Sequence, residues 1–309
     1  FLNMNFTRVD LFNVVLLAAS INAFVVLVQY LSGLFIPGSH GDFLMHPEFN
    51  SEINMAWRKP GLFSGYPHSA VLSAFGAIVG FYFLFNKITA SYFIAFAMCF
   101  VTLLLSSRTG MILGLLGITL LFPPFISARR VNLLIFTLFV LVVAISIFYV
   151  VQINPVLLVT FEMMFELFIN LFKGQGLSSA SQSDLYSSFG YPVEKVSTLI
   201  FGNGLPHNAD NLLNVDAGFQ QSLFGGGFIH LVLIYLIFFI MMFTSVKNVL
   251  KLTVEKFIVL MFFAFIFISN LKGGFLFSRG PADVLILFFV FSITEKYFTN
   301  QKMDFIKHK

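Results

Sequence analysis

Long, continuous apolar runs separated by short polar links dominate the chain. Eight of these runs approach the roughly 20 residues that an α-helix needs to cross a bilayer. Because the runs are continuous and do not alternate, we expect helices and not a membrane β-barrel. The pattern predicts an all-α, polytopic protein with a single integral membrane domain, 1–309. The expected spans are 11–36, 70–85, 88–105, 111–126, 131–153, 218–244, 257–271 and 284–294.

The composition agrees with a membrane location. Hydrophobic residues make up 58% of the chain, charged residues only 10%, and Phe alone accounts for 44 positions. The mean hydropathy is +0.90. No basic stripe on a polar surface is present, which excludes nucleic acid as a partner. Cys99 is the only cysteine, so the chain has no disulfide and no Cys-based metal site. We also expect no cofactor.

The placement of Lys and Arg predicts the orientation of the spans. Short links that carry Lys87, or Arg129 and Arg130, are expected inside, with both termini in the cytoplasm. Two long segments, 37–68 and 154–216, are then external loops. The second opens with a predicted helix that lies in the membrane interface and ends at Gly174, because its polar positions recur every four residues among phenylalanines.

Arg108 lies on a very short link between two apolar runs. A charge at that depth is costly unless it meets a partner, so it suggests a functional site. The planar fork of an arginine suits a carboxylate or a phosphate. The alternative is that Arg108 only reaches toward lipid headgroup phosphates. Arg279 lies on a second short external link and has the same two interpretations.

Three separated motifs, in order and on one predicted membrane face, resemble the O-antigen ligase and polymerase family of bacterial membrane glycosyltransferases. The first is Arg58–Ala70, and the second is Ser107–Gly110. The third joins the Gly-x-Gly turn at Phe201–Gly204 to His207, Asn208 and Gly218. The residues after Gly218 depart from the ligase pattern, and Asp216–Phe219 is more similar to the polymerases. Family members have about ten to twelve spans, so either N-terminal spans are absent or this protein is short.

The resemblance implies a GT-C-like fold and a polymerase that joins polyprenyl-diphosphate-linked repeat units of a surface polysaccharide. It implies the inner membrane of a bacterium, an active site on the external, periplasmic face, and a flippase and a chain-length regulator as partners. A diphosphate leaving group needs charge stabilisation above all. We expect Arg108, Arg279 and Arg58 to bind it, His207 to be the catalytic base, and Asn208, Asp216 and His68 to bind substrate, with no metal.

Several alternatives stay open at this point. Arg58 could be a solvated loop charge, and His68 could cap the span that follows it. His207 could bind the diphosphate as a cation instead of acting as a base. The chain could be a ligase that transfers the glycan to another acceptor, or a transporter or flippase of lipid-linked sugars. A transporter would have charged or broken spans near the middle of the bilayer.

Overall fold

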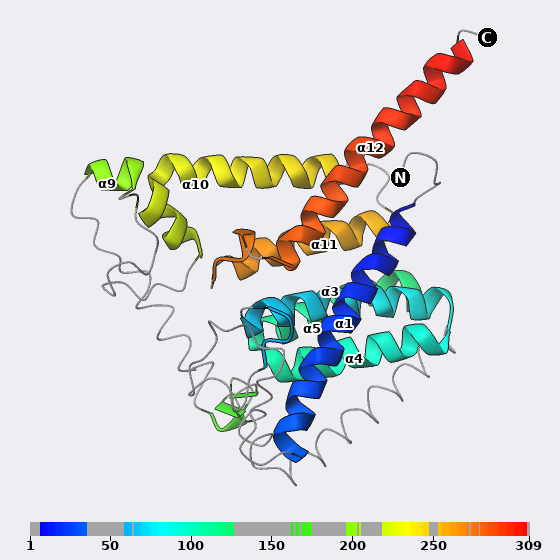
Figure 1. Ribbon diagram of the computed structural model, residues 1–309, viewed down its shortest axis with the longest axis vertical. Coiled ribbons are helices and arrows are strands. Elements are labelled where there is room, and N and C mark those ends of the chain that lie inside the picture. The colour runs from blue at the N-terminus through cyan, green and yellow to red at the C-terminus, as the bar shows by residue number, and fades with distance from the viewer. Residues whose placement is uncertain are drawn as a thin grey trace. The chain divides into compact units, whose positions relative to one another are not determined.

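The computed structural model describes residues 7–35, 59–63, 65–126, 196–202, 204, 218–246, 253–271, 273–277 and 279–307, with isolated positions between 162 and 174. The chain divides into two compact units, Phe1–Ser179 and Ala180–Lys309. All regular structure in the described residues is helical (Figure 1).

The first unit is built from α1 (Arg8–Phe35), α3 (Tyr66–Asn86), α4 (Ala90–Ser106) and α5 (Arg108–Ile126). Local signals start these helices. Thr7 and Asp10 bond each other's backbone N–H groups before α1, which is a reciprocal cap. The Thr89 hydroxyl accepts a bond from the Tyr92 N–H at the start of α4. Pro67 occupies the first turn of α3, where its missing N–H costs nothing.

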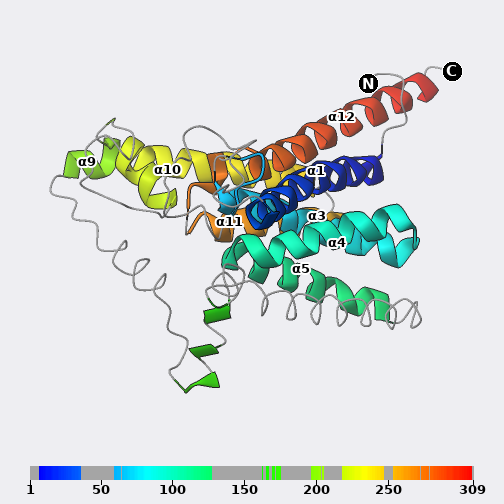
Figure 2. The same cartoon turned by 60° about the horizontal axis from the view of Figure 1, so that its bottom comes forward.

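The helices of this unit pack side by side (Figure 2). α1 runs alongside α4 with a constant offset. The Tyr92 hydroxyl donates to Asn13 and the Thr102 hydroxyl donates to the Ala23 carbonyl, each across 79 positions. α3 lies at the centre of the unit, and 94% of its most apolar stretch of 18 residues is buried inside the protein. The two contacts show that α1 and α4 run parallel, so their C-terminal parts lie at the same end of the unit.

The second unit contains α9 (Val196–Phe201), α10 (Gly218–Ser245), α11 (Val254–Ser269), the 3-10 turn η3 (Phe275–Phe277) and α12 (Pro281–Lys307). The hydroxyl of Thr253 caps α11 by accepting from the Lys256 N–H. α10 is broken at Gly227, where φ is 72°. Figure 1 shows this bend beside α9.

Helices occupy the positions of seven of the eight expected spans, and several of them extend beyond the expected bounds. The eighth expected span, 131–153, lies outside the described residues. Three helical segments are long and apolar enough to cross a membrane: Arg8–Ser32, Tyr66–Asn86 and Gly218–Ser245. α4 and the apolar part of α5 are shorter. The full count of eight spans stays a prediction.

The solvent-exposed faces of α1 and α10 are apolar. Leu17 and Phe24 of α1 are exposed, and so are Leu233, Ile237 and Ile240 of α10. Contiguous exposed apolar faces of this kind mark contact with a membrane or with another protein. Buried polar side chains such as Asn22 and Gln29 lie on the inner face of α1 instead. This distribution agrees with helices that are surrounded by lipid.

The predicted interfacial helix is described only in part. Residues 162, 165, 166, 169, 170 and 172 are helical. The Lys173 N–H bonds the Ile169 carbonyl, and Gly174 follows with a φ of 73°. A glycine in this left-handed conformation is a common helix end. The expected end of the helix at Gly174 is therefore confirmed, while its position in the membrane interface stays a prediction.

Candidate anion site at one end of the first unit

The polar segments that precede α3 and α5 lie together at one end of the first unit. The C-terminal parts of α1 and α4 meet there with the first turns of α3 and α5. Tyr30 of α1 marks this end, because its hydroxyl donates to the Leu105 carbonyl near the end of α4 at 2.9 Å. The described part of the first motif, 59–63 and 65–70, and the second motif are both located here, although they are far apart in the chain.

The segment 59–63 of the first motif is fixed to α1 by two side-chain amides. Gln29 donates to the Gly61 carbonyl at 3.2 Å and accepts from the Gly61 N–H at 3.0 Å. Asn22 accepts from the Leu62 N–H at 2.9 Å and donates to the Ser69 hydroxyl at 2.6 Å. A buried backbone group needs such a partner, so these amides allow an irregular segment to enter the apolar bundle.

The second motif lies against the first through a close helix contact. A Cβ added to Gly110 would lie 2.5 Å from the Ala70 Cβ and 2.8 Å from the Ala70 carbonyl oxygen. Only glycine therefore lets the first turn of α5 pack against the first turns of α3. Arg108 precedes Gly110 by two positions, as His68 precedes Ala70. The contact thus brings Arg108 and His68 to the same end of the unit.

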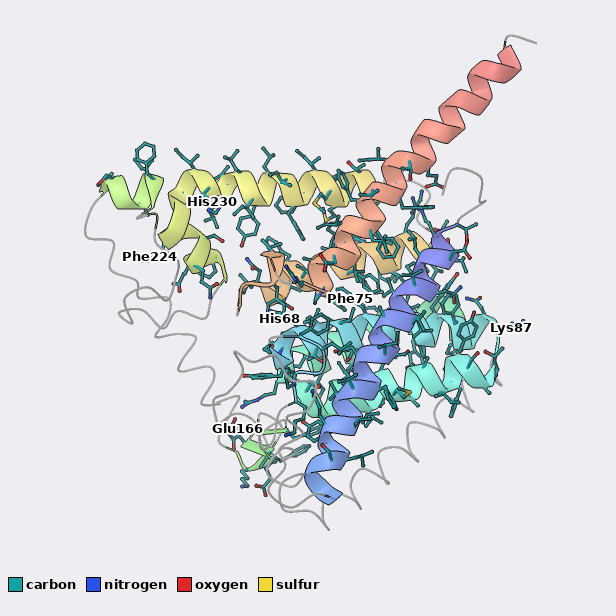
Figure 3. All side chains as sticks on the ribbon, in the orientation of Figure 1. His68, Phe75, Lys87, Glu166, Phe224 and His230 are labelled. Atoms are coloured by element: carbon teal, nitrogen blue, oxygen red, sulfur yellow. The ribbon has the colours of Figure 1, made fainter. Side chains whose placement is uncertain are left out.

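Arg108 is the first residue of α5 and forms an ion pair. Its Nη1 atom lies 2.8 Å from Oε2 of Glu166, with 11% of the arginine side chain and 29% of the glutamate side chain exposed. In the part of the chain that the structure describes, Nη1 is not hydrogen-bonded, so the contact is an ion pair only. A carboxylate was one of the two partners expected for Arg108. Figure 3 labels Glu166 on its short helical stretch.

The charges at this end favour an anion. The N-termini of α3 and α5 carry partial positive charge, and a cation such as Arg108 at a helix start is unfavourable by about 0.3–1 kcal/mol. Lys59 is also located here and is only 2% exposed. His68 lies in the first turn of α3, half-buried. Glu166 is the acidic side chain that the structure shows beside Arg108. Such a cluster can hold a phosphate.

Of the predicted site residues His68 and Arg58, the structure describes only His68. His68 is the third residue of α3, and a Cβ on the preceding N-cap residue, Gly65, would lie 3.3 Å from its Nδ1 atom. The ring of His68 therefore lies close to the N-cap residue of α3. This is compatible with either the capping or the binding interpretation. Arg58 lies outside the described residues, immediately before the buried Lys59.

In the second unit, the structure describes only part of the third motif. Gly202 follows α9, and a Cβ there would lie 2.5 Å from the Gly225 carbonyl oxygen. The Gly204 N–H donates to the same oxygen at 3.0 Å. The Gly-x-Gly turn therefore packs on the break in α10. His207, Asn208 and Asp216 lie outside the described residues, so their predicted roles are untested.

Arg279 is exposed and lies between η3 and α12. The link before it is fixed by Asn270, whose side chain accepts from the Leu276 N–H at 3.3 Å and donates to the Tyr235 hydroxyl at 3.1 Å. His230 follows the break in α10 and lies 3.4 Å from the Ser222 carbonyl oxygen through Nδ1. Arg279 belongs to a different unit from Arg108, and the diphosphate clamp that would unite them stays a prediction.

The sequence interpretation missed Asn22, Gln29, Lys59 and Glu166 as parts of this site. Asn22 and Gln29 could have been found, because two amides about two helical turns apart lie on one face of an otherwise apolar helix. Glu166 is one of the polar positions that recur every four residues in the predicted interfacial helix. Its partner is remote in the chain, and no local pattern shows that contact.

Among the described residues, no three His, Cys, Asp or Glu side chains gather where they could hold a metal ion. No protein-family model, no curated protein and no solved structure matches this chain. The helices themselves define the class. Within the described residues the protein is all-helical, with three helices long and apolar enough to cross a membrane. It belongs to the broad class of helical membrane proteins.

Proposed function

We propose that the protein is a membrane glycosyltransferase that joins polyprenyl-diphosphate-linked oligosaccharide repeat units of a surface polysaccharide. The observation that carries this proposal is the position of Arg108. It begins an apolar helix, is almost fully buried, and shares one end of the unit with Lys59 and His68. A lipid-linked diphosphate has its anionic group next to a hydrocarbon chain, which is the combination that such a site fits.

The chemistry follows from the donor. The bond from the anomeric carbon to the diphosphate breaks, and a hydroxyl of the second glycan forms the new glycosidic bond while losing its proton. Arg108 stabilises the charge that develops on the departing diphosphate. His207 takes the proton in this proposal, since an imidazole is a suitable base near neutral pH. Arg279 and Arg58 add positive charge, and Asn208, Asp216 and His68 bind sugar hydroxyls.

The orientation in the proposal is that of the sequence analysis. The end of the unit that carries Arg108 faces the external, periplasmic side of a bacterial inner membrane, and the loops 37–68 and 154–216 are on that side. The acceptor in a polymerase is a second lipid-linked repeat unit. A ligase would use a different acceptor with the same donor site, so the donor chemistry does not depend on that choice.

A transporter of lipid-linked sugars is a second candidate, and the break at Gly227 favours it, because broken helices are typical of transport sites. The length of α10 after the break argues against a transporter. The part of α10 after the break, 228–245, is roughly 27 Å long at about 1.5 Å per residue, which is close to the thickness of a bilayer core of about 30 Å. The break then lies at the edge of a span and not at its middle.

Reconstitution of the purified full chain with a synthetic polyprenyl-diphosphate-linked repeat unit tests the proposal. We expect a ladder of longer lipid-linked glycans on a gel, and loss of the ladder in Arg108→Ala. Movement of the intact donor across the vesicle membrane without new glycosidic bonds would support the transporter instead. Transfer only to an added, different acceptor would support a ligase.

A further inference from the structure

The contact between Arg108 and Glu166 involves only part of the arginine. The ion pair joins Glu166 Oε2 to Nη1 of Arg108, and this nitrogen is fully covered. The 11% of the Arg108 side chain that stays accessible therefore lies elsewhere on it. A guanidinium has five N–H donors, arranged so that a carboxylate or phosphate can bind two of them side by side. An ion pair at one nitrogen leaves the other donors for a second anion.

From this geometry we infer that Glu166 is a positioning residue, which holds the Arg108 guanidinium in place so that its remaining donors can bind the diphosphate of the substrate. The inference rests on the proposed function, and it concerns a residue to which neither the sequence motifs nor the proposed chemistry assigns a role.

A partner is needed because of where Arg108 is located. A long, flexible arginine beside a membrane surface can turn its charged end toward lipid headgroups. The ion pair with Glu166 opposes that movement and keeps the charge near the first turn of α3. A binding group that is already in place loses less conformational freedom when the ligand arrives, so affinity increases. The second anion then meets a fixed arginine.

Glu166 could instead compete with the substrate for Arg108. A competing carboxylate would be expected to occupy two donors of the fork with good hydrogen-bond geometry, as such pairs commonly do. The observed contact uses one nitrogen and lacks that alignment. The two roles predict opposite signs: removal of a competitor strengthens binding of the diphosphate, whereas removal of a positioning group weakens it.

The chain provides a matched control in Glu162. It lies one helical turn before Glu166 on the same stretch, is exposed, and carries the same charge. Substitution of Glu162 changes the net charge and the helix propensity as substitution of Glu166 does. A difference between the two variants therefore excludes general electrostatics, and an Arg108→Lys background tests whether the difference comes from the contact with Arg108.

The experiment measures binding of a short-chain polyprenyl diphosphate to the full chain in lipid nanodiscs, together with the thermal stability of each variant. We expect Glu166→Ala to weaken binding about five-fold, the scale of a partly exposed ion pair. Glu166→Asp should restore most of the affinity, because it retains the charge. Glu162→Ala should bind as the unmodified protein does. In an Arg108→Lys background, Glu166→Ala should have little further effect, since the fork is already lost.

Tighter binding by Glu166→Ala would overturn the inference in favour of a competitor. Equal losses in the Glu162 and Glu166 variants, or an undiminished loss in the Arg108→Lys background, would reduce Glu166 to a structural or general electrostatic role. Binding without glycan transfer by the unmodified protein would refute the proposed function alone. Absence of any binding would overturn both the diphosphate site and the inference.

Discussion

The side-chain amide of Gln29 bonds both backbone polar groups of Gly61, with distances of 3.2 Å to the carbonyl oxygen and 3.0 Å to the nitrogen. Both residues are buried. The pair lets a non-helical segment enter an apolar helix bundle with its backbone groups satisfied. It fixes Lys59 and the beginning of α3 relative to α1, and therefore shapes the end of the unit that holds Arg108.

Replacement of Gln29 by methionine removes both bonds and preserves the approximate volume of the side chain. We expect the free energy of unfolding to fall by about 2 kcal/mol or more, since buried backbone groups left without partners cost about 1–3 kcal/mol each. Thermal unfolding in detergent measures this. The control is Leu31→Met on the exposed face of the same helix. Equal stability of the two variants would contradict the structural role of the Gln29 amide.

Replacement of Gly110 by alanine tests the contact between α3 and α5. The added Cβ would meet both the Cβ and the backbone of Ala70 at 2.5–2.8 Å, so the helices must separate. Overpacking of this kind costs about 1–3 kcal/mol. Gly114→Ala is the matched control, because the atoms nearest to its Cβ belong to the side chain of Leu103 and not to a backbone. The unfolding temperature should fall more for Gly110→Ala, and a larger fall for Gly114→Ala would argue against the close contact.

Arg108→Lys retains the positive charge but not the planar fork. We expect this variant to lose much of the polymer-forming activity, because an ammonium group cannot reproduce paired bonds to a diphosphate. The readout is polymer length on a gel, at expression levels matched by immunoblot. Polymer of normal length from Arg108→Lys would show that a point charge suffices. Normal polymer from Arg108→Ala in a stably expressed protein would remove Arg108 from the mechanism.

The proposed role of His207 predicts a pH profile. A base must be neutral to act, so the reaction rate should rise with pH through roughly 6.5. A cationic histidine that holds the diphosphate would give the opposite trend. His207→Ala should lower the rate by about a hundred-fold or more if the residue is the base. Undiminished turnover in this variant would end the proposal, and activity that is lost on addition of EDTA would show that a metal takes part.

Cysteine labelling tests the proposed orientation. A membrane-impermeant maleimide added from outside should label Ser179→Cys and should not label Ser127→Cys. The natural Cys99 is fully buried, and its replacement by serine gives a background without it. Labelling of Ser127→Cys alone would invert the topology and place Arg108 on the cytoplasmic side.

The sequence by itself determined the class of structure. Apolar runs of the right length predicted the positions of α1, α3, α4, α5, α10, α11 and α12, because a helix in lipid must satisfy its own backbone and needs no remote partner to do so. Helix ends were also locally encoded, as the left-handed conformation of Gly174 shows. Arg108 could be recognised from the sequence because a charged residue between two apolar runs is costly unless it has a partner, whatever the tertiary structure.

Only the tertiary structure decided which groups meet. Gln29 bonds the backbone of Gly61. Every residue has these backbone groups, so the sequence does not show which one Gln29 will bond. Glu166 pairs with Arg108 through a contact between distant segments, and several glutamates could have served equally well on charge alone. Gly110 packs against Ala70 because α3 and α5 lie side by side with their first turns at the same level. These contacts depend on how preformed helices pack, and packing is set by shape over long sequence separations and not by local pattern.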